Sequence, residues 1–78
     1  MPTLLQVEGF RFFFYSNERG EPPHVHVERG EGEAKFWLDP LRIAYAHRLT
    51  PAEQRRAREL VFQHQGLFKE RWLEHFSR

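Results

Sequence analysis

An alternating run that follows two prolines constrains the fold of this chain more than any other stretch. The run is Glu21-Pro22-Pro23-His24-Val25-His26-Val27-Glu28. Proline is excluded from helix interiors, and alternation with a period of two is typical of a half-buried strand. Successive side chains of a strand point to opposite faces, so the two valines are predicted to face a core. The other face then carries His24, His26 and Glu28, which makes it the first place to look for chemistry.

Further strands are predicted on both sides of this run. Glu8-Gly9 and Gly30-Glu31-Gly32 are typical of hairpin turns, because glycine adopts positive φ without strain. Alternation and aromatic content predict strands over Thr3–Val7, Phe10–Tyr15, His24–Arg29 and Glu33–Leu38, with Leu41–Ala46 as an optional fifth. Short loops between strands favour an antiparallel meander.

The C-terminal part is predicted to be helical. Thr50, Pro51 and Glu53 form a capping box with proline at the first helical position. Apolar residues and one histidine recur near a 3.6-residue period: Ala57, Leu60, Val61, His64, Leu67, Phe68, Trp72 and Phe76. One helix of this length is long beside so small a sheet, so we expect a kink or break near Gly66.

The predicted fold is therefore a single α+β domain over residues 1–78. A small antiparallel meander of four strands, five with the optional one, spans about residues 3–46. A C-terminal helix or kinked helix pair, over about residues 51–76, packs on one face. The core face of the sheet is predicted to carry Phe10, Phe12, Phe14, Val25, Val27, Ala34, Phe36 and Leu38.

Composition and charge exclude several classes of protein. The chain contains no cysteine, which rules out disulfides and thiolate metal sites and fits a reducing cytoplasm. No signal peptide and no membrane-spanning stretch is recognisable. The net charge of +1 does not favour non-specific nucleic-acid binding. Residues 1–40 have a net charge of −3, however, and residues 41–78 have a net charge of +4.

The sheet face opposite the core is too aromatic for a solvated surface and too charged for a core. Together with His24 and His26 it carries six predicted binding residues: Arg11, Phe13, Tyr15, Glu28, Lys35 and Trp37. Surfaces that combine aromatic, arginine and histidine side chains commonly bind a partner or a ligand. We therefore predict that this face is functional, with the two histidines at its centre.

Three roles are open for His24 and His26. They are candidate catalytic residues of acid–base chemistry, such as metal-independent RNA cleavage, with Arg11 or Lys35 stabilising phosphoryl charge. They are also candidate metal ligands, with Glu28 as the third. The third role is structural, in which both rings only hold neighbouring segments in place. The sequence by itself assigns no metal site and no cofactor, and leaves open whether the protein is an enzyme.

Four blocks of the chain carry a family resemblance. They are Met1-Pro2-Thr3, residues 11–18, residues 21–27 and residues 34–38. In this order and spacing they resemble the bacterial family known as domain of unknown function 4160, apart from Gly66 in the helical part. The family implies no established activity and no catalytic residues.

The resemblance also implies a partner. Members are often encoded beside a second small family, domain of unknown function 2442, in an arrangement reminiscent of a toxin–antitoxin or regulatory gene pair. The function expected on this basis is a small cytoplasmic protein-interaction module. Its partner would be that second protein or another copy of itself. The contact would be made through the sheet face opposite the core or through the basic helix. RNA is the alternative partner.

Overall fold

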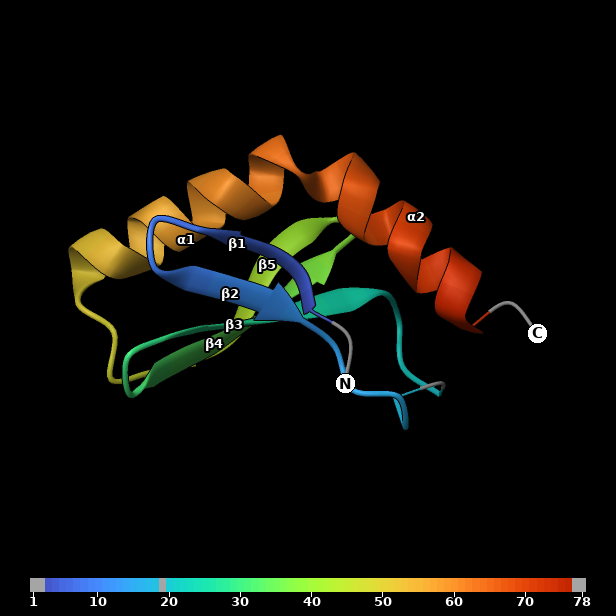
Figure 1. The fold of residues 1–78 in the computed structure, drawn as a ribbon, viewed down its shortest axis with the longest axis horizontal. Helices are drawn as coiled ribbons and strands as arrows, with labels where there is room; N and C mark the ends of the chain where they lie inside the picture. Colours follow the sequence, from blue (N-terminus) through green and yellow to red (C-terminus); the bar gives the residue numbers. More distant parts are fainter. Residues whose placement is uncertain (1–2, 19, 77–78) are drawn as a thin grey trace.

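The computed structural model describes residues 3–18 and 20–76 of the chain. Five strands precede two helices: β1 (Thr3–Val7), β2 (Phe10–Phe13), β3 (His24–Arg29), β4 (Gly32–Leu38), β5 (Leu41–His47), α1 (Pro51–Gln63) and α2 (Gln65–Phe76). The strands form one antiparallel sheet in sequence order, and the helices arch over one of its faces (Figure 1). The predicted α+β meander is confirmed, and the optional fifth strand is present. The Met1-Pro2 end of the first family block lies outside the described residues.

Tight turns join most of the strands. Glu8 and Gly9 have φ values of 55° and 83°, and two positive φ values in a two-residue hairpin match the right-handed twist of the flanking strands. The second hairpin uses Gly30, at φ 58°, and Glu31. The β2–β3 connection is the exception, because β2 ends at Phe13, two residues earlier than predicted. The described residues between these strands, 14–18 and 20–23, therefore belong to one long loop.

The helical part begins and breaks for identifiable reasons. The Thr50 side chain accepts a hydrogen bond from the Glu53 amide at 3.0 Å, and the Glu53 carboxylate accepts one from the Thr50 amide at 2.8 Å. This reciprocal pair is the predicted capping box. The predicted break is confirmed as a helix pair, but it falls at His64, two residues before Gly66. Within the described residues, neither helix has the length and apolar character needed to cross a membrane.

The core lies between the sheet and the two helices. Its buried residues are Phe10, Phe12, Val25, Val27, Ala34, Phe36, Leu38, Leu49, Ala57, Leu60, Val61 and Phe68. Phe12 stacks on Phe68 of α2 with ring centroids 5.4 Å apart. Phe14, predicted to belong to this face, is buried but lies outside the main cluster, because it has left the sheet and packs on Trp72 and Phe76 at the end of α2.

A β-bulge in β5 changes which face its side chains occupy. Lys35 pairs with Tyr45, whereas Phe36 pairs with Ile43, so Ala44 is an extra residue in β5. A bulge shifts the alternation of side chains after it. Tyr45 therefore shares the face of Lys35, although uninterrupted alternation places it with Leu41 and Ile43. This face is the one that carries the histidines.

Candidate metal centre

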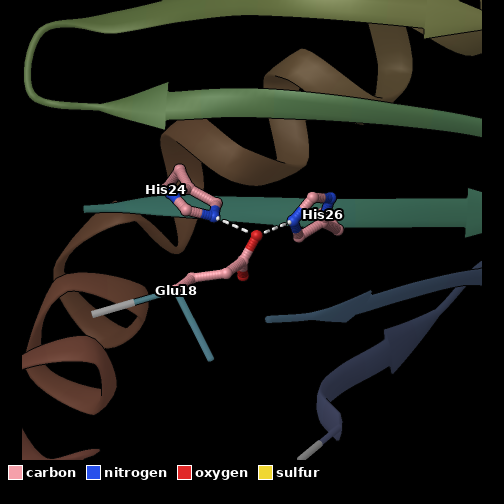
Figure 2. A group of neighbouring side chains, drawn as sticks. All are labelled: Glu18, His24 and His26. Carbon is pink, nitrogen blue, oxygen red and sulfur yellow. Dashed lines mark hydrogen bonds and ion pairs between the residues drawn. The ribbon is translucent and has the colours of Figure 1, made fainter. Parts of the chain in front are cut away.

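Both histidines lie on β3 and are buried, although they occupy the sheet face opposite the main core. The side chain of His24 is fully buried and His26 is 7% exposed. Burial on both faces of an antiparallel strand needs a second cover. The β2–β3 loop and the end of α2 supply it. Glu18 from this loop reaches back to the two rings (Figure 2), and Trp72 of α2 contacts His24 with ring centroids 4.7 Å apart.

The Glu18 carboxylate bridges the two imidazoles. Its Oε2 atom lies 2.9 Å from His24 Nε2 and 2.8 Å from His26 Nε2. The three side chains can each offer one ligand atom, and these atoms all lie within 4.8 Å of one another. Only 10% of the Glu18 side chain is exposed. The structure thus brings two imidazole nitrogens and one carboxylate oxygen together in a largely dry position.

Glu18 is ionised at neutral pH. Burial by itself raises the pKa of its carboxyl, but the contact with His26 and the hydrogen bond from the Tyr15 amide outweigh it, so the pKa lies below the ordinary value. The Tyr15 amide donates to Glu18 Oε1 at 2.8 Å. One carboxylate oxygen is therefore held by the backbone, and the other is left to the histidines.

The proton on neutral His24 is assigned by its neighbours. Its Nδ1 lies 2.9 Å from the Pro22 carbonyl oxygen, which can only accept, so Nδ1 carries the hydrogen. Nε2 of the neutral ring then presents a lone pair to an anionic oxygen. In this neutral form the two atoms are close but share no hydrogen, whereas with both ring nitrogens protonated they form an ion pair. Among the described residues, His24 Nε2 is the one buried side-chain nitrogen or oxygen without a hydrogen-bond partner.

His26 is held by aromatic side chains and by Tyr45. The ring stacks on Phe13 with centroids 5.5 Å apart and meets the edge of Tyr15 at 4.9 Å. His26 Nδ1 lies 3.4 Å from the Tyr45 hydroxyl, a long hydrogen bond that the β5 bulge makes available. Each of the three clustered side chains thus has a second partner behind the atom that faces the cluster.

The other residues predicted for this face are engaged around the cluster. Arg11 donates to Glu28 at 2.8 Å and lies over the Phe13 ring, 4.4 Å from its centroid. Lys35 donates to Glu21 at 2.7 Å and lies 4.3 Å from the Trp37 ring centroid.

Under the metal-binding role, Glu28 was the candidate third ligand, and the structure leaves it outside the cluster. The strand places it beyond the histidines, where its Oε1 pairs with Arg11, and Glu18 takes the position instead. Sequence reasoning missed Glu18 and Tyr45 because a loop and a bulge bring them in. The signal available for Glu18 was an acidic residue in a long loop that returns to a histidine-bearing strand.

Fold and site together define a small α+β protein with a buried cluster of two histidines and one carboxylate. The chain belongs to the family described as domain of unknown function (DUF4160), whose sequence profile matches residues 9–73. This match confirms the resemblance found from the four sequence blocks. No curated protein and no solved structure gives a significant match to the chain.

Proposed function

We propose that this protein binds one divalent transition-metal ion through Glu18, His24 and His26. The observation that carries the proposal is the buried Nε2 atom of His24, which has no hydrogen-bond partner and lies 2.9 Å from a carboxylate oxygen. A buried polar atom without a partner costs about 1–3 kcal/mol. A cation between the two atoms would use the lone pair of Nε2 and the charge of Glu18 at once.

The donor set suits such an ion. Two imidazole nitrogens and one carboxylate oxygen are the protein ligands of one class of zinc site and of the facial triad of non-haem iron. Metal-binding histidines generally donate the hydrogen of their other ring nitrogen to a carbonyl or carboxylate. Pro22 provides that carbonyl for His24 at 2.9 Å, and the Tyr15 amide holds the ligand carboxylate.

The distances from the carboxylate oxygen to the two nitrogens need only a small adjustment. Two donor atoms bound tetrahedrally at about 2.0–2.1 Å lie roughly 3.4 Å apart. Glu18 Oε2 lies 2.8 and 2.9 Å from the two nitrogens. Moving Oε2 outward by about half an ångström would give that spacing. Because Glu18 sits on a loop rather than on a strand, side-chain rotation can supply the movement.

Three protein ligands leave a coordination position for water or another small ligand. A bound ion of this kind polarises carbonyl or phosphoryl oxygens and lowers the pKa of bound water. Metal-independent RNA cleavage by His24 and His26 has less support, because both Nε2 atoms face Glu18 and not a substrate. The reducing cytoplasm remains the expected compartment, since the chain has no cysteine.

The test is metal content and affinity of protein purified without a histidine tag. Elemental analysis should find one zinc, iron or nickel per chain. Titration of metal-stripped protein with zinc should show one binding site. Glu18→Gln or His26→Asn should lower the zinc affinity by more than about 100-fold, which exceeds the usual effect of losing an outer-shell partner. Glu28→Gln and His75→Asn are matched controls, because they remove the same groups outside the cluster.

Equal weakening by the control substitutions would show non-specific surface binding and contradict the proposal. So would folded wild-type protein that takes up no metal. Circular dichroism of each variant separates loss of the site from loss of the fold.

Partner binding, expected from the family resemblance, is a separate proposal. Co-purification with the product of the neighbouring gene tests it, and absence of a complex together with absence of a growth effect on expression would contradict it. A surface suited to a partner lies at β5, on the other side of the molecule from β1.

A further inference from the structure

We infer that the edge strand β5 and the adjoining surface of α1 bind an acidic, extended segment of another protein. This surface, called the β5 edge below, comprises Arg42, Ile43, Ala44, Arg55 and Arg58. The inference is independent of metal binding, because none of these residues belongs to the Glu18–His24–His26 cluster.

The first argument is the unpaired strand. β5 is the last strand in the sheet order, and among the described strands β4 is its one neighbour. It is 7 residues long, and Arg42, Ile43 and Ala44 are exposed at its middle. Edge strands offer unpaired backbone groups to which an extended peptide adds as a further strand.

The second argument is a groove beside the strand. Phe36, Ile43, Pro51, Gln54, Arg55 and Arg58 line a depression between β5 and α1. Ile43 is 42% exposed, an unusual position for an isoleucine that pairs with a fully buried phenylalanine. Side chains of an added strand on the Ile43 face would lie beside Arg55 and Arg58, where acidic groups find partners. Alternate side chains would lie on the other face, with Arg42.

The third argument is charge. Arg42, Arg55 and Arg58 make no ion pair with any described residue, whereas on the β1 side of the molecule Arg56 pairs with Glu8 and Glu59. The first turns of α1 add the positive end of the helix dipole. One edge of the molecule is thus neutralised internally and the other is not. This asymmetry favours an acidic partner at β5.

A second copy of the chain fits less well. Pairing β5 with β5 would bring arginines of two copies together, and pairing β5 with β1 would build an open fibre instead of a closed dimer. The charge of Arg42 is a device that keeps edge strands from self-association. Opposite charge on the added strand overcomes it, which is why we name an acidic strand from a different protein.

The experiment uses the full chain and synthetic peptides. The probe is a peptide of 7 residues, equal in length to β5, that alternates glutamate with valine. A lysine–valine peptide of the same length is the charge control. Backbone amide NMR shifts report where each peptide binds. Arg55→Glu and Arg58→Glu should each lower the affinity for the acidic peptide by about three- to tenfold. Arg71→Glu on α2, the matched control, should have little effect on this affinity.

Support requires that the acidic peptide shift the amides of residues 41–47 and that the lysine peptide not do so. The inference is overturned if those amides do not move, if both peptides bind equally, or if Arg71→Glu acts as strongly as the α1 variants. It is also overturned if only a single-stranded oligonucleotide moves them, which would make the surface a nucleic-acid site. Sedimentation showing a dimer that Arg42→Glu alters would assign β5 to self-association instead.

Discussion

His24 Nε2 and Glu18 Oε2 lie 2.9 Å apart, and in the neutral form of His24 no hydrogen stands between them. The lone pair of the nitrogen and the anionic oxygen repel each other at this distance. The contact is relieved if His24 takes up a second proton or if a cation binds between the atoms. A metal ion and this proton therefore compete, and metal binding is expected to weaken as the pH falls.

Metal binding should stabilise the fold strongly. A ligand that binds only the native state at 100 times its Kd adds about 2.7 kcal/mol to the free energy of unfolding. For a domain of this size that gain corresponds to a rise in Tm of roughly 10–20 °C. Differential scanning calorimetry with and without zinc measures it, and a chelator should reverse it. Glu18→Gln should remove the rise, while His75→Asn should keep it; a rise of equal size in Glu18→Gln would count against the site.

The Tyr45 hydroxyl should modulate the affinity for the metal without being one of its ligands. It lies 3.4 Å from His26 Nδ1, on the side of the ring away from Glu18. Loss of such an outer partner typically lowers metal affinity by 10- to 100-fold. Because this hydrogen bond is long, we expect Tyr45→Phe to lower the zinc affinity by about tenfold. Tyr15→Phe is the matched control, because Tyr15 contacts the same ring through its aromatic edge. Equal losses in both variants would mean that ring packing and not the hydroxyl matters.

Acid should remove the contribution of Glu18 to stability in the metal-free protein. The pKa of its carboxyl is lowered from 4.5 in the folded state. A group with a depressed native pKa stabilises the fold above its unfolded pKa, and this stabilisation is lost as the pH falls through the native value. The free energy of unfolding of Glu18→Gln should therefore approach that of the wild type below about pH 4.5.

Urea unfolding at neutral pH and at about pH 3.5 measures this difference. Glu31→Gln, in the exposed β3–β4 turn, is the control. The prediction fails if the gap between the wild type and Glu18→Gln is the same at both pH values.

Two phenylalanines on the helices should differ sharply in their importance for stability. Phe68 is fully buried against Phe12, whereas Phe62 on α1 is 66% exposed. Phe68→Ala should cost about 3–5 kcal/mol, because it removes a ring and leaves a cavity. A domain this small has little stability to spare, so this variant is expected to be largely unfolded at 37 °C. Phe62→Ala should change the unfolding midpoint little, and a comparable loss in both variants would contradict the assigned core.

Local patterns predicted much of this architecture. The alternation around the valines of β3, the hairpin glycines and the capping box at Thr50 each depend on neighbouring residues alone, and each is present as expected. The break in the helical part was expected from its length relative to the sheet. Its position at His64 was not, because the capping of a helix end depends on contacts such as the hydrogen bond from the Gln65 side chain to the Leu38 carbonyl.

The candidate site was predicted only in its strand-borne part. His24 and His26 follow from alternation, because a strand fixes which side chains share a face. Glu18 approaches them across a loop, and Tyr45 reaches the same face because a bulge interrupts the alternation of β5. Neither loop path nor bulge has a periodic signal in the sequence.

The sequence by itself therefore determined a meander of at least four strands, the helical cover and the shared face of the two histidines, since all three arise from periodicity and local turn chemistry. Only the tertiary structure decided that Glu18 and not Glu28 completes the cluster. The physical reason is that Glu28, two positions beyond His26, pairs with Arg11 directly opposite it on β2, while the loop buries Glu18 between the two rings.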